Sequence, residues 1–122
     1  MSSTATATLV QTSIDQRTIK VWGTIAVTAG TYTAGGLTLD LSKLIISPAV
    51  PLEVKIYSQA QPLASPPTSV SGYIYSYGLG TTQANGTLQI LDVSTSVLAE
   101  ISGSTPTAVV NDTIGFHAVF VR

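Results

Sequence analysis

The side chains that could take part in chemistry are few in this sequence and lie far apart along the chain. His117 is the only histidine, cysteine is absent, and the six acidic residues occur singly. General acid–base or nucleophilic catalysis needs a second titratable group within hydrogen-bonding reach, and no local spacing predicts such a pair. His117 falls between Phe116 and Ala118 in a strand-like stretch. We interpret it as an ordinary strand residue and expect no catalytic residues and no enzyme.

Metal and cofactor sites are not expected either. The sequence has no His/Cys cluster, and its acidic residues lack the dense spacing of a calcium loop. The stretch GLGTTQANG, residues 78–86, contains three glycines. It matches neither the dinucleotide-binding pattern nor the phosphate-binding loop with its lysine, and we interpret it as a hairpin loop with a turn at Asn85-Gly86. We therefore predict no metal and no cofactor.

A row of tyrosines is the feature with the most functional character. The stretch YIYSYGLG places Tyr73, Tyr75 and Tyr77 at alternate positions, so in a strand all three point to one face. Such a row could form a sugar-binding platform, a subunit contact or part of a core. A sugar platform needs carboxylates or amides beside the rings, and residues 73–79 contain none. The opposite face carries only small side chains and one isoleucine, which favours packing or subunit contact.

Further candidate contact residues lie outside this row. In the strand expected at Arg17–Thr28, Ile19, Val21 and Ile25 share one face and Trp22 projects from the other. Gly23 falls on the apolar face, which predicts a bulge or a close approach of another chain segment. The segment Gln59–Gly72 has no charge and no periodicity, and we expect it to be a long surface loop. Its prolines Pro62, Pro66 and Pro67 complete the candidate interface.

The elements that position these residues are predicted to be strands. Helix signals are nearly absent, whereas Thr, Val, Ile and Tyr occur in runs with a period of two. Strands are expected at residues 17–28, 37–39, 51–58, 73–78, 87–93, 96–101 and 113–121, with a hairpin loop at 29–36 and a helical turn at 40–44. The fold class predicted is all-β, an antiparallel β-sandwich or barrel of jelly-roll type with about eight strands.

Composition limits the possible partners. Only 9% of the residues are charged, against about 25% in ordinary soluble domains. Five basic and six acidic residues nearly cancel and form no basic patch, so we expect no nucleic-acid partner and no membrane partner. The N-terminus lacks a signal-peptide pattern, which suggests a protein made in the cytoplasm. We expect one domain at residues 9–122, preceded by a flexible arm at 1–8 and containing the loop 59–72.

Three blocks of the sequence resemble small structural proteins of tailed bacteriophages. They are GTIAVTAGTYTAGGLTLDLSKL at 23–44, YIYSYGLGTTQANGTLQIL at 73–91 and DTIGFHAVFVR at 112–122. The resemblance implies a capsid decoration, or cement, protein that binds the outside of the head and stabilises contacts between capsomers. It also implies the major capsid protein as partner, a homotrimer, and a location on the virion exterior. The arm 1–8 and the loop 59–72 would then be contact elements. A carbohydrate- or receptor-binding module of a phage tail or fibre remains the alternative.

Overall fold

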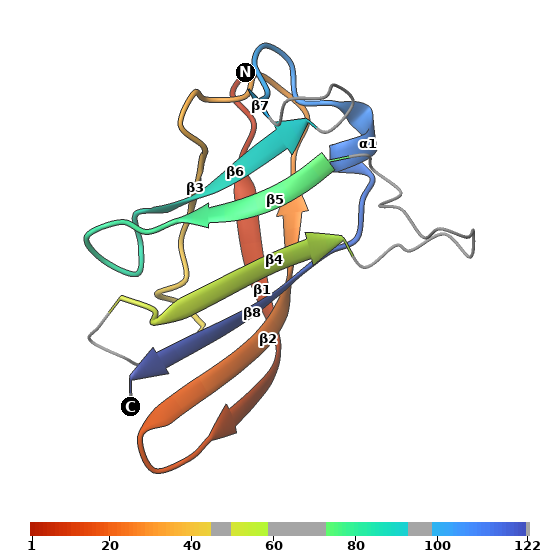
Figure 1. The fold of residues 1–122 in the computed structure, drawn as a ribbon. Coiled ribbons are helices and arrows are strands. Elements are labelled where there is room, and N and C mark those ends of the chain that lie inside the picture. The colour runs from red at the N-terminus through yellow and green to blue at the C-terminus, as the bar shows by residue number, and fades with distance from the viewer. Residues whose placement is uncertain (45–49, 59–72, 93–98, 122) are drawn as a thin grey trace.

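In the computed structural model, which describes residues 1–44, 50–58, 73–92 and 99–121, the chain is an all-β protein (Figure 1). The described part contains eight strands and one helix of four residues. The elements are β1 (Ala5–Ile14), β2 (Thr18–Val27), β3 (Leu37–Leu39), β4 (Glu53–Ser58), β5 (Tyr73–Gly78), β6 (Gly86–Asp92), β7 (Ala99–Glu100), α1 (Thr107–Val110) and β8 (Ile114–Val121). The described helix is too short and too little apolar to cross a membrane.

The strands form two antiparallel sheets. The first has the strand order β1-β2-β8-β4, and the second has the order β3-β6-β5, with β7 also paired to β6. No described strand belongs to both sheets, so these sheets do not close into a barrel. In Figure 1 the second sheet covers only part of the first, and the turn between β1 and β2 extends well beyond it. The prediction of an all-β, antiparallel fold is confirmed.

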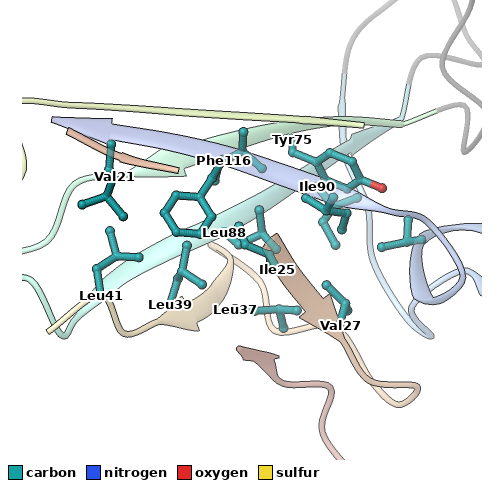
Figure 2. Packing of buried hydrophobic residues seen from close by; sticks show 14 of the residues in the cluster. Val21, Ile25, Val27, Leu37, Leu39, Leu41, Tyr75, Leu88, Ile90 and Phe116 are labelled. Carbon is teal, nitrogen blue, oxygen red and sulfur yellow. The ribbon is translucent and has the colours of Figure 1, made fainter. Parts of the chain in front are cut away.

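The core lies between the two sheets and follows the alternation of the strands. On β8 every inward residue, Ile114, Phe116, Ala118 and Phe120, is almost fully buried. The second sheet contributes Leu37, Leu39, Leu88 and Ile90 from its facing side (Figure 2). Each such apolar side chain stabilises the fold by roughly 1.5–3 kcal/mol when it is buried. The face that the sequence predicted for β8 is therefore the face that holds the sheets together.

At Gly23, β1 and the core ring of Phe116 approach the same backbone position. A side chain at Gly23 would overlap the carbonyl oxygen of Thr8 and would lie 2.7 Å from Cε1 of Phe116. At the same level the register of β1 against β2 shifts between Leu9 and Gln11, so Val10 forms a bulge. The expectation of a bulge or a close approach at Gly23 is confirmed, and the extra residue is in the partner strand.

The connection at 29–36 differs from the hairpin expected there. β2 pairs with β1 and β8 in the first sheet, whereas β3 pairs with β6 in the second, so this segment crosses between the sheets. Tyr32 in the crossing segment is buried; its hydroxyl donates to Oε2 of Glu100 at 2.8 Å and accepts from the amide of Ile90 at 3.3 Å. The hairpin prediction was wrong because glycine-rich loops are common to hairpins and crossovers alike.

The N-terminal residues belong to the sheet in place of forming a separate arm. β1 begins at Ala5, and the buried hydroxyl of Ser3 lies 2.6 Å from the hydroxyl of Thr105.

Two further predictions concern connecting segments. Residues 42–44 form a turn, not a helix, in which Oδ1 of Asp40 accepts from the amide of Ser42 at 2.8 Å. The predicted loop 59–72 lies outside the described residues.

Candidate functional site

The tyrosine row faces the core. On β5 the side chain of Tyr75 is 5% exposed, and Tyr73 and Tyr77 are partly buried and pack against the core cluster. Tyr75 is paired with Ile90 on β6, and Figure 2 shows the two side chains next to each other. The burial of Tyr75 supports the packing alternative for this position. A contact role for Tyr73 and Tyr77 stays a prediction.

Tyr75 also ties the two sheets together through a carboxylate. Its hydroxyl donates to Oδ2 of Asp112 at 2.7 Å, and the hydroxyl of Ser58 donates to Oδ1 of the same residue at 2.7 Å. Ser58 ends β4, Tyr75 lies in β5, and Asp112 precedes β8. Hydrogen bonds to a charged acceptor are about twice as strong as neutral ones. Asp112 therefore has a structural role, because its carboxylate accepts hydrogen bonds from side chains of both sheets.

Tyr77 lies over a glycine on the neighbouring strand. A side chain at Gly86 would overlap the hydroxyl of Tyr77, which explains why glycine occupies the first position of β6. Within the described part of the chain, the buried Tyr77 hydroxyl has no hydrogen-bond partner. Burial raises the pKa of this hydroxyl. The turn predicted at Asn85-Gly86 lies two residues earlier, at Gln83-Ala84, because Gly86 already belongs to β6 and neither Asn85 nor Gly86 has a positive φ. The Asn85 side chain closes the loop by accepting from the Thr82 amide at 2.9 Å.

The outer face of the first sheet carries the second large ring of the candidate set. Trp22 on β2 stacks on His117 on β8, with 5.0 Å between ring centroids and 24° between the planes. The ladder pairs Trp22 with Gln11 on one side and His117 with Lys55 on the other, so one row crosses all four strands. We call this surface the Trp22 face; it consists of Gln11, Trp22, Lys55, Tyr57 and His117.

The Trp22 face combines aromatic rings with few fixed charges. Trp22 and His117 are partly exposed, and Tyr57 is exposed on the neighbouring strand. Lys55 and Glu53 form an ion pair at 3.4 Å, but both side chains are largely in solvent, where such a pair contributes little. Nε2 of His117 is buried and has no hydrogen-bond partner among the described residues. This arrangement suits contact with a partner surface, since partly exposed aromatic residues are enriched where proteins meet.

A shallow groove lies between β4 and β5, where the two sheets come side by side without pairing. Its volume is about 430 Å³, within the range of small-ligand pockets. The groove is lined by Val54, Lys55, Ile56, Tyr57, Tyr75, Ser76 and Tyr77. It joins the buried tyrosine row to the Trp22 face, and it places an ammonium group and a hydroxyl group beside tyrosine rings. The β5 segment alone offers no such charged partner.

Several carboxylates are engaged in local structure. Oδ1 of Asp15 accepts from the Thr18 amide at 2.9 Å, and this and further hydrogen bonds lower the pKa of Asp15. Hydrogen bonds from the Ser42 hydroxyl and amide likewise lower the pKa of Asp40. Glu100 accepts from Tyr32 and from the amide of Gly35. Among the described residues, no group of three or more His, Cys, Asp or Glu side chains is placed to hold a metal ion.

The free edge of β1 is a surface that was not predicted from the sequence. This strand of ten residues pairs with β2 on one side, and no described strand pairs with its other side. Its signal is present in the sequence, because TATATLVQTSI alternates β-branched residues with others over residues 4–14. The small alanines on its inner side make the apolar alternation weak; residues 1–8 were expected to be a flexible arm, and no strand was predicted before Arg17.

No protein-family model matches the chain, and neither a curated protein nor a solved structure matches it.

Proposed function

We propose that this protein is a structural component of a bacteriophage virion, a decoration protein that binds the outer surface of the head and stabilises contacts between capsomers. The Trp22 face is the observation that carries the contact function. Its stacked Trp22 and His117 rings lie on a broad sheet surface in a chain of unusually low charge. The resemblance of residues 23–44, 73–91 and 112–122 to phage structural proteins supplies the capsid as the partner.

The mechanism is linkage between binding and assembly. A protein that binds the assembled shell but not the dissociated subunits stabilises the shell by mass action. Aromatic side chains such as Trp22 and Tyr57 bury large areas at a contact, and a neutral surface approaches a shell without charge repulsion. The resemblance further implies that three copies bind together and that the major capsid protein is the partner.

The first test is the composition of particles. The gene for this chain is expected beside a gene for a major capsid protein, and mass spectrometry of the purified virions should find the chain at stoichiometric copy number. Virions that lack the chain would reject the proposal.

The second test assigns the face that binds. Capsids without the chain are mixed with purified wild type, and co-sedimentation measures binding. Trp22→Ser should reduce binding strongly, whereas Ile74→Ser, which removes an exposed apolar side chain from the outer face of the other sheet, should bind as the wild type does. Equal binding by the two variants would show that the Trp22 face is not the contact surface.

A carbohydrate- or receptor-binding role is the second candidate, favoured by the groove between β4 and β5. Its tyrosine rings offer stacking surfaces, and Lys55 and Ser76 beside them supply hydrogen-bonding groups in place of the carboxylates or amides that residues 73–79 lack. A glycan array comparing wild type with Tyr57→Ala tests this role, because Tyr57 is exposed and its loss should leave the core intact. Binding that depends on Tyr57 would favour this candidate, and an array without binding would reject it.

A further inference from the structure

The free edge of β1 has the features of a strand that pairs with another chain. It is ten residues long, whereas edge strands of soluble proteins are often short or protected by charge or proline. Residues 1–14 contain no charged side chain and no proline. The bulge at Val10 is the only protective device on this strand, and beyond it the strand continues into the hairpin that extends past the second sheet (Figure 1).

The backbone groups that face outward can be assigned from the ladder. The amide of Asp15 bonds to the carbonyl of Thr18 at 3.0 Å, which closes the hairpin as a hydrogen-bonded pair. Because hydrogen-bonded and non-bonded pairs alternate along an antiparallel ladder, the amide and carbonyl groups of Thr12 and Ile14 point away from β2. An unpaired row of such groups is a template for another strand.

The side chains beside this row are apolar and exposed. Val10 is 68% exposed and Ile14 is 59% exposed, although Ile14 lies opposite the buried Ile19 and so faces the side of the sheet that holds the core elsewhere. The second sheet does not extend to this end of the hairpin. Residues 10–14 therefore offer a partner strand two exposed apolar side chains, together with two residues whose backbone amide and carbonyl groups point away from β2.

We propose that β1 pairs edge to edge with β1 of a second copy of this chain, antiparallel and about a twofold axis at Thr12. This register sets Val10 of one copy opposite Ile14 of the other, and Gln11 opposite Ser13. Each copy then covers the two exposed apolar side chains of its neighbour, and the paired residues 10–14 carry no charge, so like charges do not meet.

The strand that pairs with β1 is expected to come from a second copy of the chain, because no other sheet edge among the described residues is both long and uncovered. The edges of β4 and β5 lie beside each other within one copy, and β3 is only three residues long. β3 lies beside β1 but is too short to cover it, so β1 is the one long edge of the described chain that no other long described strand lies beside. A contact in which each copy uses the same surface closes as a dimer. This differs from the trimer that the phage resemblance implies, and it does not depend on the proposed capsid function.

Sedimentation velocity of the purified chain tests the pairing. The wild type should pass, as concentration rises, from the 12.6 kDa monomer to twice that mass. Val10→Lys should raise the dissociation constant about tenfold or more, because a tenfold change needs only about 1.4 kcal/mol. Leu79→Lys is the matched control, since Leu79 is 64% exposed in the loop after β5 and likewise exchanges an exposed aliphatic side chain for lysine. Equal dimerisation of the two variants would overturn the proposal.

Cross-linking tests the register and does not rely on a destabilising change. The natural chain has no cysteine, so a single introduced cysteine can only form a disulfide between two copies. Thr12→Cys should give a covalent dimer rapidly under oxidation, because residues on the axis meet at a distance that suits a disulfide. Leu79→Cys should not. A wild type that stays monomeric, a trimer insensitive to Val10→Lys, or Thr12→Cys that cross-links only to capsids would each overturn the proposal.

Discussion

β1 and β5 contrast in what their sequences suggest and where the fold places them. β5 contains three tyrosines, yet they face the core, and Tyr75 is among its buried members. β1 contains mainly threonine, serine, alanine and a few aliphatic residues, yet it exposes Val10, Ile14 and a free edge. A side chain's type indicates what it can do, but its position relative to the second sheet decides whether a partner can reach it.

The largest effect on stability is expected for Tyr75, the buried residue of β5. Tyr75→Ala should lower the free energy of unfolding by about 3–5 kcal/mol, the usual cost of removing a large buried ring, and it should also remove a donor from Asp112. Urea denaturation measures the change. The corresponding substitution of an exposed residue of β1, Thr12→Ala, should change stability by less than about 0.5 kcal/mol. Similar losses for both variants would contradict the assignment of β5 to the core and β1 to the surface.

The junction between the two regions is Gly23, where β1 meets the core. Gly23→Ala should lower the free energy of unfolding by about 1–3 kcal/mol, because the added methyl group overpacks against Thr8 and Phe116. Thermal unfolding measures it, with Thr24→Ala on the outward face of the same strand as control. If Gly23→Ala were neutral, β1 would not be held as closely to Phe116 as the structure indicates.

The pH dependence of stability tests the crossing segment that joins the sheets. Burial, together with the hydrogen bond to Glu100, raises the pKa of Tyr32 to about 12. A pKa raised on folding means that this tyrosine stabilises the fold fully below its unfolded value of about 10. The stabilisation is then lost as the pH rises through the folded value. The melting temperature should therefore fall between pH 10 and about 12.

Tyr32→Phe is the matched variant for this measurement. It should be less stable at neutral pH by about 1–3 kcal/mol, because Glu100 and the Ile90 amide each lose a partner. Its alkaline decline should be shallower than that of the wild type, with Tyr77 still contributing because the pKa of Tyr77 is also raised. If the melting temperature of Tyr32→Phe fell as steeply with pH as that of the wild type, the ionisation of Tyr32 would not be coupled to unfolding.

The smallest effect on stability is expected for Val10, an exposed residue of β1. Val10→Ser should leave the free energy of unfolding of the monomer within about 0.5 kcal/mol of the wild type, since Val10 lies in the bulge and is largely exposed. Denaturation at a concentration below that of self-association measures it. A loss above 1 kcal/mol, roughly the mean for point mutants, would mean that Val10 packs within its own chain.

Strand positions with strong alternation were predicted correctly. Ile114, Phe116 and Phe120 were expected on one face of the last strand and are buried together, and Trp22 was expected opposite Ile19 and Val21 and lies there. Alternation identifies these faces because successive residues of a strand point to opposite sides. β1 was missed because Ala5 and Ala7 give little apolar contrast with the neighbouring threonines.

The candidate surfaces were predictable only in part. Trp22 was singled out from the sequence, but its stacking partner was dismissed as an ordinary strand histidine. Lys55 and the tyrosine row lie 18 or more positions apart in the chain, and only the packing of β4 beside β5 brings them to one groove. Tyr32 was not noticed at all, because a single tyrosine in a glycine-rich segment gives no periodic signal.

The sequence by itself determined that this chain forms antiparallel strands, and which face of most strands is buried. These properties depend on residues two positions apart, so a local pattern is enough to specify them. The tertiary structure alone decided that the tyrosine row faces the core, that β3 joins a different sheet from β2, and that β1 has a free edge. Each of these depends on pairing between strands distant in the chain, and many pairings satisfy the same local alternation.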